Sequence, residues 1–284
     1  MTVAVDFFDT PIFIISYNRL DDLKRMVSNL LYDGYKNLII IDNASSNPQL
    51  LNYLKAVDDS RVTIKRLQKN YGHRVLWDSH FFDDIIQNQY YVLTDPDVFP
   101  IEGCPKNYIE VFYDILKQYP KKTKVGFSLK IDDLPEDYPY KYDIIPFESF
   151  HWERKLPYNF TIYDAPIDTT FALYRPGEIK ENNFYDGIRT GGAYIARHQG
   201  WYTHSATLNK EYLNDNNVSS TSMNSKAMKN FQIQVIFRLL PKAKPDIIHL
   251  MKDIMERTDL KKYSFFRMLG FAGYVIRKKI VSWI

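Results

Sequence analysis

The segment Asp95-Pro96-Asp97 places two carboxylates directly after an apolar, strand-like run, Tyr90-Tyr91-Val92-Leu93-Thr94. Two negative charges at the end of a buried strand are costly to desolvate unless a cation neutralises them. Mn²⁺ and Mg²⁺ take oxygen ligands and keep coordination positions open for substrate phosphates. We therefore predict a divalent metal site that involves Asp95 and Asp97, and the alternative interpretation is an ordinary surface turn.

The chain before these aspartates alternates between strand-like and helix-like segments. Short β-branched and aromatic runs predict buried strands, and amphipathic spacing predicts helices. The strands are expected at residues 11–17, 38–41, 62–67 and 90–94, and the helices at residues 20–31, from Asn47-Pro48 onward and at 75–86. Such alternation predicts an α/β fold with a mostly parallel sheet flanked by helices. Ligands of these sheets bind beyond the carboxyl ends of the strands.

The second half of the chain is less regular. We predict a helix at residues 107–119 and strands at 125–129, 169–174 and 193–196, with loops and short strands over 131–165. The polar run at 214–225 predicts a loop. The expected organisation is one domain over residues 1–250, with a nucleotide-binding half at 10–130 and an acceptor half at 131–250, followed by a basic amphipathic helical segment at 251–284.

Four segments, in this order and spacing, resemble the GT-A fold glycosyltransferases, most closely the family 2-like bacterial enzymes. They are IISYNR at Ile14–Arg19, IIIDNASS at Ile39–Ser46, Asn70-Tyr71-Gly72 and Thr94–Asp97. The resemblance implies a GT-A, Rossmann-like fold and the transfer of a sugar from a nucleotide-sugar. The segment His73–Trp77 departs from the usual helix start of the family.

The resemblance also assigns roles to residues by position. It implies that Asp97 is the direct metal ligand and that Asp95 contacts ribose, the metal or a metal-bound water. The remaining nucleotide-sugar contacts that it implies are Tyr17, Asn18, Arg19, Asp42, Asn70 and Gly72.

Asp168 is the predicted general base. It lies in Asp164-Ala165-Pro166-Ile167-Asp168-Thr169-Thr170, at the start of an expected strand. In an inverting transferase a carboxylate deprotonates the acceptor hydroxyl on the side opposite the leaving group. Asp164 is the second candidate, a turn-capping role is the structural alternative, and a retaining mechanism stays open if Asp168 lies away from the acceptor.

The stretch Arg189–Tyr202 combines a glycine pair with arginines, a histidine and aromatic residues. Enzymes of the GT-A type often recruit a C-terminal histidine as a third metal ligand, which implies His198, with His204 as the alternative. Arg189 or Arg197 is expected to pair with phosphate. A structural role is the alternative for each of these residues.

The charge distribution favours a small-molecule enzyme over a nucleic-acid-binding protein. Six of the 37 Lys and Arg residues and none of the 34 Asp and Glu residues follow Leu260, so residues 1–260 carry a formal charge of −3 and residues 261–284 of +6. A mildly acidic body argues against general nucleic-acid binding. The basic, aromatic-rich C-terminal segment predicts an anionic membrane surface as a partner, or packing on the protein itself or on a second subunit in a homodimer.

Other features of the sequence bear on the cellular compartment in which the protein is expected. The single cysteine, Cys104, excludes an internal disulfide or a Cys-rich zinc site. No apolar run reaches the ~18 residues of a membrane span, and the N-terminus lacks the basic segment of a signal peptide. We expect a cytoplasmic protein, with peripheral association at the inner face of the membrane as the hypothesis for its C-terminal segment.

The combined prediction is a hexosyltransferase-type glycosyltransferase that uses Mn²⁺ or Mg²⁺ and a UDP-sugar. Its expected acceptor is a bacterial surface glycan or its lipid-linked precursor. A nucleotidyltransferase is the enzymatic alternative, although the glycine-free turn Ser16–Leu20 disfavours it. A catalytically inactive glycan-binding protein is the non-enzymatic alternative, and it would require neither Asp95 nor Asp97.

Overall fold

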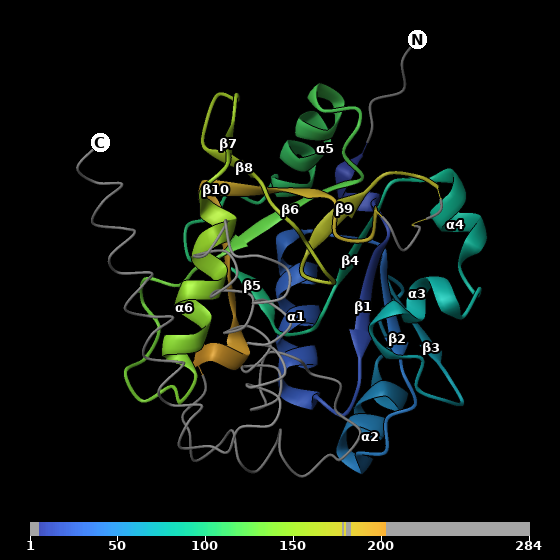
Figure 1. Ribbon diagram of the computed structural model, residues 1–284. Coiled ribbons are helices and arrows are strands. Elements are labelled where there is room, and N and C mark those ends of the chain that lie inside the picture. Colours follow the sequence, from blue (N-terminus) through green and yellow to red (C-terminus); the bar gives the residue numbers. More distant parts are fainter. Residues whose placement is uncertain (1–5, 178, 180–182, 203–284) are drawn as a thin grey trace, which may run out of the picture. The chain divides into compact units, whose positions relative to one another are not determined.

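The computed structural model of the protein describes residues 6–177, 179 and 183–202 (Figure 1). The chain divides into two compact units, of which the first comprises Met1–Leu129 and Arg154–Gln199 and the second Lys130–Glu153 and Gly200–Ile284. The predictions for His204, for the polar run at 214–225 and for the basic segment at 251–284 lie outside the described residues. No helix within the described ranges is long and apolar enough to cross a membrane.

The first unit contains a ten-stranded sheet in the order β3-β2-β1-β4-β9-β6-β10-β8-β7, with β5 paired to β10 (Figure 1). The strands are β1 (Ile12–Ser16), β2 (Leu38–Asp42), β3 (Val62–Arg66), β4 (Tyr91–Thr94), β5 (Val98–Pro100), β6 (Lys124–Leu129), β7 (Lys155–Leu156), β8 (Ile162–Asp164), β9 (Ala172–Tyr174) and β10 (Gly187–His198). The helices of this unit are α1 (Leu20–Asp33), α2 (Pro48–Ala56), α3 (Val75–Asp78), α4 (Asp83–Asn88) and α5 (Tyr108–Gln118).

The strands β3, β2, β1 and β4 form the parallel half of this sheet. Each of them pairs in parallel with its neighbour. All residues of β1, β2 and β4 are buried, as expected of parallel strands covered on both faces. The predicted α/β fold class, with a sheet flanked by helices, is confirmed.

The strands β9, β6, β10, β8, β7 and β5 form the mixed half. Here β9 is antiparallel to both β4 and β6, whereas β6 and β10 are parallel. The strands β8 and β5 pair antiparallel with β10. Because β9 runs against β4, the residues that precede β9 lie at the same edge of the sheet as the residues that follow β4.

Local signals explain several helix boundaries. Asn47 caps α2 by accepting hydrogen bonds from Gln49 N and Leu50 N, and Pro48 occupies the first turn, where its missing N–H has no cost. Gly34 ends α1 in the left-handed region at φ 100°.

Several sequence predictions differ from the structure. The strand expected at 169–174 begins only at Ala172, so Asp168 lies in a loop and not at a strand start, and the strand expected at 193–196 is part of the longer β10. The helix expected at 75–86 is interrupted between α3 and α4, where His80 has a φ of 58° that an α-helix cannot accommodate. The second unit contains a helix, α6 (Lys141–Ser149), within the range 131–165 for which only loops and short strands were predicted. Pro146 lies inside α6, and because proline is unfavourable within a helix the sequence does not predict a helix there. The side chain of Ile144 on the same helix is buried.

Candidate active site

The carboxyl ends of β1, β2 and β4 meet at one edge of the sheet, which we call the carboxyl edge. The pairing of Ser16 with Asp42 and of Ile14 with Thr94 brings the loops after these strands together. The structure therefore places Tyr17-Asn18-Arg19, Asp42 and the Asp95–Asp97 segment at neighbouring positions, as the sequence predicts.

Asn18 joins the loops after β1 and β2. Its Oδ1 accepts hydrogen bonds from Ser46 N at 2.8 Å and Asn47 N at 2.9 Å, and its own N–H donates to Ser45 Oγ at 3.0 Å. It adopts the left-handed conformation at φ 56°, which asparagine tolerates better than most residues. These bonds assign Asn18 a structural role, and contact with the nucleotide-sugar by Asn18 or Tyr17 remains a prediction.

Asp42 is fully buried at the end of β2. Its Oδ1 accepts a hydrogen bond from Ser45 N at 3.0 Å, and Arg66 Nε lies 3.3 Å from Oδ2. Among the described residues, Oδ2 has no hydrogen-bond partner. Apart from its ion pair with Arg66, this buried oxygen can therefore accept a hydrogen bond, and it suits the N–H of a nucleotide base.

Asn43 connects the second loop to the Asn70-Tyr71-Gly72 segment. Its Nδ2 donates to Asn70 Oδ1 at 2.8 Å and to Gly72 O at 3.0 Å, and its Oδ1 accepts from Tyr71 N at 2.8 Å. Gly72 has a φ of 75° in this turn. The predicted contacts Asn70 and Gly72 thus lie beside the loop that follows Asp42. The linking role of Asn43 was missed from the sequence, because a motif position does not reveal which side-chain bonds it makes.

Asp97 is the most deeply buried carboxylate of the predicted metal site, with a side-chain exposure of 1%. Its Oδ2 forms an ion pair with Arg19 Nη1 and lies 3.7 Å from His198 Nε2. Its Oδ1 has no hydrogen-bond partner among the described residues. Burial alone would raise the pKa of Asp97, but the charges of His198 and Arg19 outweigh this effect and hold the pKa below its ordinary value.

Asp95 lies beside the chain that precedes β9. Its N–H donates to Thr169 O at 3.1 Å, and Thr169 Oγ1 donates to Asp95 Oδ2 at 2.7 Å. Burial, together with the negative charge of Asp97, raises the pKa of Asp95 to about 8. The two carboxylates of the Asp-Pro-Asp segment therefore differ: Asp97 is ionised, and Asp95 binds a hydroxyl from the mixed half.

His198 reaches Asp97 through the antiparallel pairing of β5 with β10. His198 pairs with Val98, and Gln199 N donates to Asp97 O at 2.7 Å. The predicted proximity of a C-terminal histidine to the metal-site aspartate is thus present in the structure. Arg197, the other candidate for phosphate, pairs with Phe99 on the same strands.

Asp97 and His198 are suitable ligands for Mn²⁺ or Mg²⁺. The partnerless Oδ1 of Asp97 is an oxygen ligand of the kind that these ions prefer, and the imidazole suits Mn²⁺ better than Mg²⁺. Within the described ranges, no three or more side chains of His, Cys, Asp or Glu are arranged to hold a metal ion. The remaining ligands would therefore have to come from substrate phosphate and water.

Asp168 lies in the loop formed by residues 165–171, between β8 and β9, which we call the acceptor-side loop. The residue is exposed, and its Oδ1 accepts a hydrogen bond from Thr170 N at 3.1 Å. Because the next residue, Thr169, bonds to Asp95, the predicted base lies adjacent to the predicted metal site. Asp164, the second candidate, instead forms ion pairs with Lys122 at 2.5 Å and Arg154 at 3.1 Å.

Arg189 is buried in β10, with 4% exposure. Its Nε donates to Pro166 O at 2.8 Å, so it supports the acceptor-side loop from the sheet. Its predicted contact with phosphate remains a prediction.

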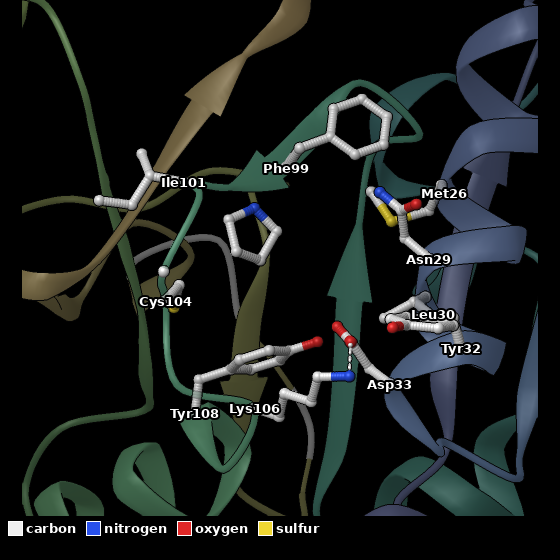
Figure 2. Close-up of a pocket in the computed structure, with 12 residues that line it drawn as sticks. Met26, Asn29, Leu30, Tyr32, Asp33, Phe99, Ile101, Cys104, Lys106 and Tyr108 are labelled. Atoms are coloured by element: carbon white, nitrogen blue, oxygen red, sulfur yellow. Dashed lines mark ion pairs between the residues drawn. The ribbon is translucent and has the colours of Figure 1, made fainter.

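A cavity of about 250 Å³ lies between α1 and the chain that follows β5 (Figure 2). Its lining contains none of the predicted site residues. Its charged groups pair with one another, since Lys106 Nζ lies 2.9 Å from Asp33 Oδ1 and 4.3 Å from the centre of the Tyr32 ring (Figure 2). This cavity is therefore not part of the carboxylate site.

No protein-family model and no curated protein matches this sequence. Among solved structures, S. aureus TarS 1–349 matches with a TM-score of 0.39 and 12% identity, over 84% of this chain and 68% of that one. The same fragment in complex with UDP matches with a TM-score of 0.42 and 9% identity, over 93% and 80% of the two chains. The structure of S. aureus TarS matches with a TM-score of 0.44 and 8% identity, over 89% and 46%. Likenesses this weak carry no argument about activity.

Proposed function

We propose that this protein is a metal-dependent glycosyltransferase that moves a sugar from a nucleotide-sugar, a UDP-sugar by preference, to a hydroxyl of a glycan or lipid-linked saccharide with inversion. One observation carries the proposal. An exposed carboxylate, Asp168, is held beside Asp95 and the buried Asp97 by the hydrogen bonds between Thr169 and Asp95. A base and a metal-binding carboxylate at one edge of a sheet are what transfer from a nucleotide diphosphate requires.

The nucleotide would bind at the loops of the parallel half. Asp42 Oδ2 is the acceptor for an N–H of the base, and Asn70 with Gly72 lies beside the base or ribose. Arg19 lies at the start of α1, within ion-pair distance of Asp97. Its guanidinium would interact with phosphate oxygens as well as with this carboxylate.

The metal would be held by Asp97 and His198, with Asp95 adjacent. When bound, a divalent ion supplies positive charge that stabilises the departing diphosphate. Asp97 is paired with Arg19, whose positive charge favours the ionised carboxylate that a metal ion binds.

The transfer itself requires a base on the acceptor side. Asp168 takes the proton of the acceptor hydroxyl, and the hydroxyl oxygen forms a bond to the anomeric carbon. The bond between this carbon and the phosphate oxygen breaks, and its electron pair leaves with the nucleoside diphosphate. Attack from the side opposite the leaving group inverts the anomeric configuration.

A donor screen tests this proposal. The protein is incubated with UDP-, GDP-, CMP- and dTDP-sugars, with and without Mn²⁺, and nucleotide release is measured. We expect Mn²⁺-dependent release from a UDP-sugar. Pyrophosphate release from a nucleoside triphosphate and a sugar phosphate would indicate a nucleotidyltransferase, and the absence of turnover and of UDP binding would contradict the proposal.

A further inference from the structure

Lys124, the first residue of β6, has a fully buried side chain. Its Nζ donates hydrogen bonds to Asp168 O at 3.1 Å, Tyr174 Oη at 3.1 Å and Phe184 O at 2.5 Å. An ammonium group has three N–H donors, so these three acceptors satisfy it completely. Lysine is almost never fully buried, and its retention at this position requires such compensation.

The three acceptors connect the chain on both sides of β9. Asp168 lies in the acceptor-side loop before β9, Tyr174 lies in β9, and Phe184 lies in the segment that leads to β10. Tyr174 Oη also donates to Asp168 O at 3.0 Å, so this carbonyl accepts two hydrogen bonds. The ammonium lies 4.7 Å from the centre of the Tyr174 ring and 4.8 Å from that of Phe184, which adds a cation–π contribution.

The charges that act on Lys124 come from neighbouring elements. Burial and the positive charge of Arg189 lower the pKa of its ammonium to about 7, whereas the negative charges of Asp168 and Asp186 oppose this shift. Arg189 also bonds Pro166 O, so two buried basic side chains hold the acceptor-side loop against the sheet.

We propose that Lys124 is a positioning residue for glycosyl transfer, because it fixes the backbone of Asp168 and thereby the direction of the Asp168 carboxylate. The inference rests on the proposed function, in which Asp168 is the base. Thr170 N holds Oδ1, and Thr169 ties the next residue to Asp95. With the carbonyl also held by Lys124 and Tyr174, Oδ2 is the carboxylate oxygen that takes the proton of the acceptor.

Lys124→Met tests this role, because it removes the ammonium and keeps the length of the side chain. We expect kcat for nucleotide release to fall by about 10- to 100-fold, since small misplacements of a reacting group have effects of this size. The affinity for UDP with Mn²⁺ should stay unchanged. Lys155→Met, which removes an exposed strand lysine from β7, is the matched control and should leave both quantities unchanged.

A double variant separates positioning from general destabilisation. If Lys124 acts through Asp168, Lys124→Met causes no further loss of turnover in an Asp168→Asn background. An equal loss in both backgrounds, or a fall in UDP affinity as large as the fall in kcat, would overturn the inference. Tyr174→Phe provides a milder variant if Lys124→Met does not fold, because it removes one donor to Asp168 O and keeps the ring. It should lower kcat by less and show the same dependence on Asp168.

Amide hydrogen exchange distinguishes failure of this inference from failure of the proposed function. Exchange at residues 165–171 should be faster in Lys124→Met than in the wild type, and unchanged in Lys155→Met. Unchanged exchange in Lys124→Met would contradict the positioning role alone. A wild type that releases no nucleotide from any donor would contradict the proposed function, and the positioning role with it.

Discussion

The parallel half and the mixed half of the sheet supply the site in different ways. In the parallel half, the predicted binding residues lie in the loops after consecutive parallel strands, and side-chain bonds join each loop to its neighbour, as between Asn18 Oδ1 and Ser46 N and between Asn43 Nδ2 and Asn70 Oδ1. In the mixed half, Asp168 and His198 reach the carboxyl edge through the antiparallel pairing of β9 with β4 and of β10 with β5. In the proposed function, donor binding would therefore depend on neighbouring loops of the parallel strands, whereas catalysis would depend on residues that antiparallel strand pairing brings to the same edge.

The largest expected effect is the loss of turnover caused by a substitution in the mixed half. Asp168→Asn should lower turnover by about 10²- to 10⁴-fold, because an amide cannot act as a general base. UDP binding in the presence of Mn²⁺ should persist, since the parallel half is unchanged. Steady-state nucleotide release and calorimetry measure the two quantities.

Two further variants sharpen this prediction. Asp58→Asn, at an exposed position after α2, is the control and should behave as the wild type. Asp164→Asn compares the two candidate bases, and a loss of turnover in Asp164→Asn that exceeds the loss in Asp168→Asn would transfer the role of base to Asp164.

The next largest expected effect is the loss of UDP affinity caused by a substitution in the parallel half. Asp42→Asn should weaken UDP binding by about 10- to 100-fold, because it replaces one acceptor for the base N–H with a group that can present a donor, a change of about 1–3 kcal/mol. The turnover of the saturated enzyme should change much less. A variant that binds UDP as tightly as the wild type would remove Asp42 from the nucleotide site.

The pH dependence of the free energy of unfolding tests the lowered pKa of the buried Lys124. Its pKa is lowered from 10.5 to about 7, so between these values the unfolded chain binds a proton that the folded protein does not. The free energy of unfolding of the wild type should therefore increase with pH between 7 and 9, relative to that of Lys124→Met, by up to about 1.4 kcal/mol per pH unit. Urea unfolding at pH 7, 8 and 9 measures this difference, and parallel pH profiles of the two proteins would contradict it.

The smallest effect tests whether the loops of the parallel half are fixed locally. Asn47→Ala removes the side-chain cap of α2 and should lower the free energy of unfolding by about 1 kcal/mol. Ser46→Ala is the control, because Ser46 contributes its backbone N–H to the contact with Asn18. Chemical denaturation compares the two variants, and equal losses would show that the capping bonds of Asn47 do not account for the effect.

The parallel half of the site could be predicted from the sequence, whereas the contacts of the mixed half could not. The runs at β1, β2 and β4 are apolar and end at polar residues, so their positions and the shared edge follow from pattern alone. The contact between Thr169 and Asp95 joins residues far apart in the sequence, and no periodicity encodes it. The short strand β5 and the helix α6 with its internal proline were missed for a similar reason, because tertiary packing overrides their weak local signals.

Lys124 shows most clearly what could not be predicted from the sequence. A lysine at the start of an apolar strand indicates an exposed end, yet its side chain is fully buried. Its three acceptors include two backbone carbonyls, and a sequence does not show where carbonyls point. Asp168 itself could be proposed from its type and neighbours, whereas the groups that hold it in place could not.

Calorimetric titration of Asp97→Asn with UDP and Mn²⁺ tests the central claim most directly. The claim is that the carboxyl edge binds a nucleotide diphosphate through a divalent ion held by Asp97 and His198. One neutral amide oxygen cannot replace a carboxylate ligand, so we expect Asp97→Asn to lose the Mn²⁺-dependent part of UDP binding while its circular dichroism spectrum stays that of the folded protein. Asp58→Asn should bind UDP with Mn²⁺ as the wild type does. Wild-type affinity in Asp97→Asn, or wild-type binding that does not depend on Mn²⁺, would contradict the account.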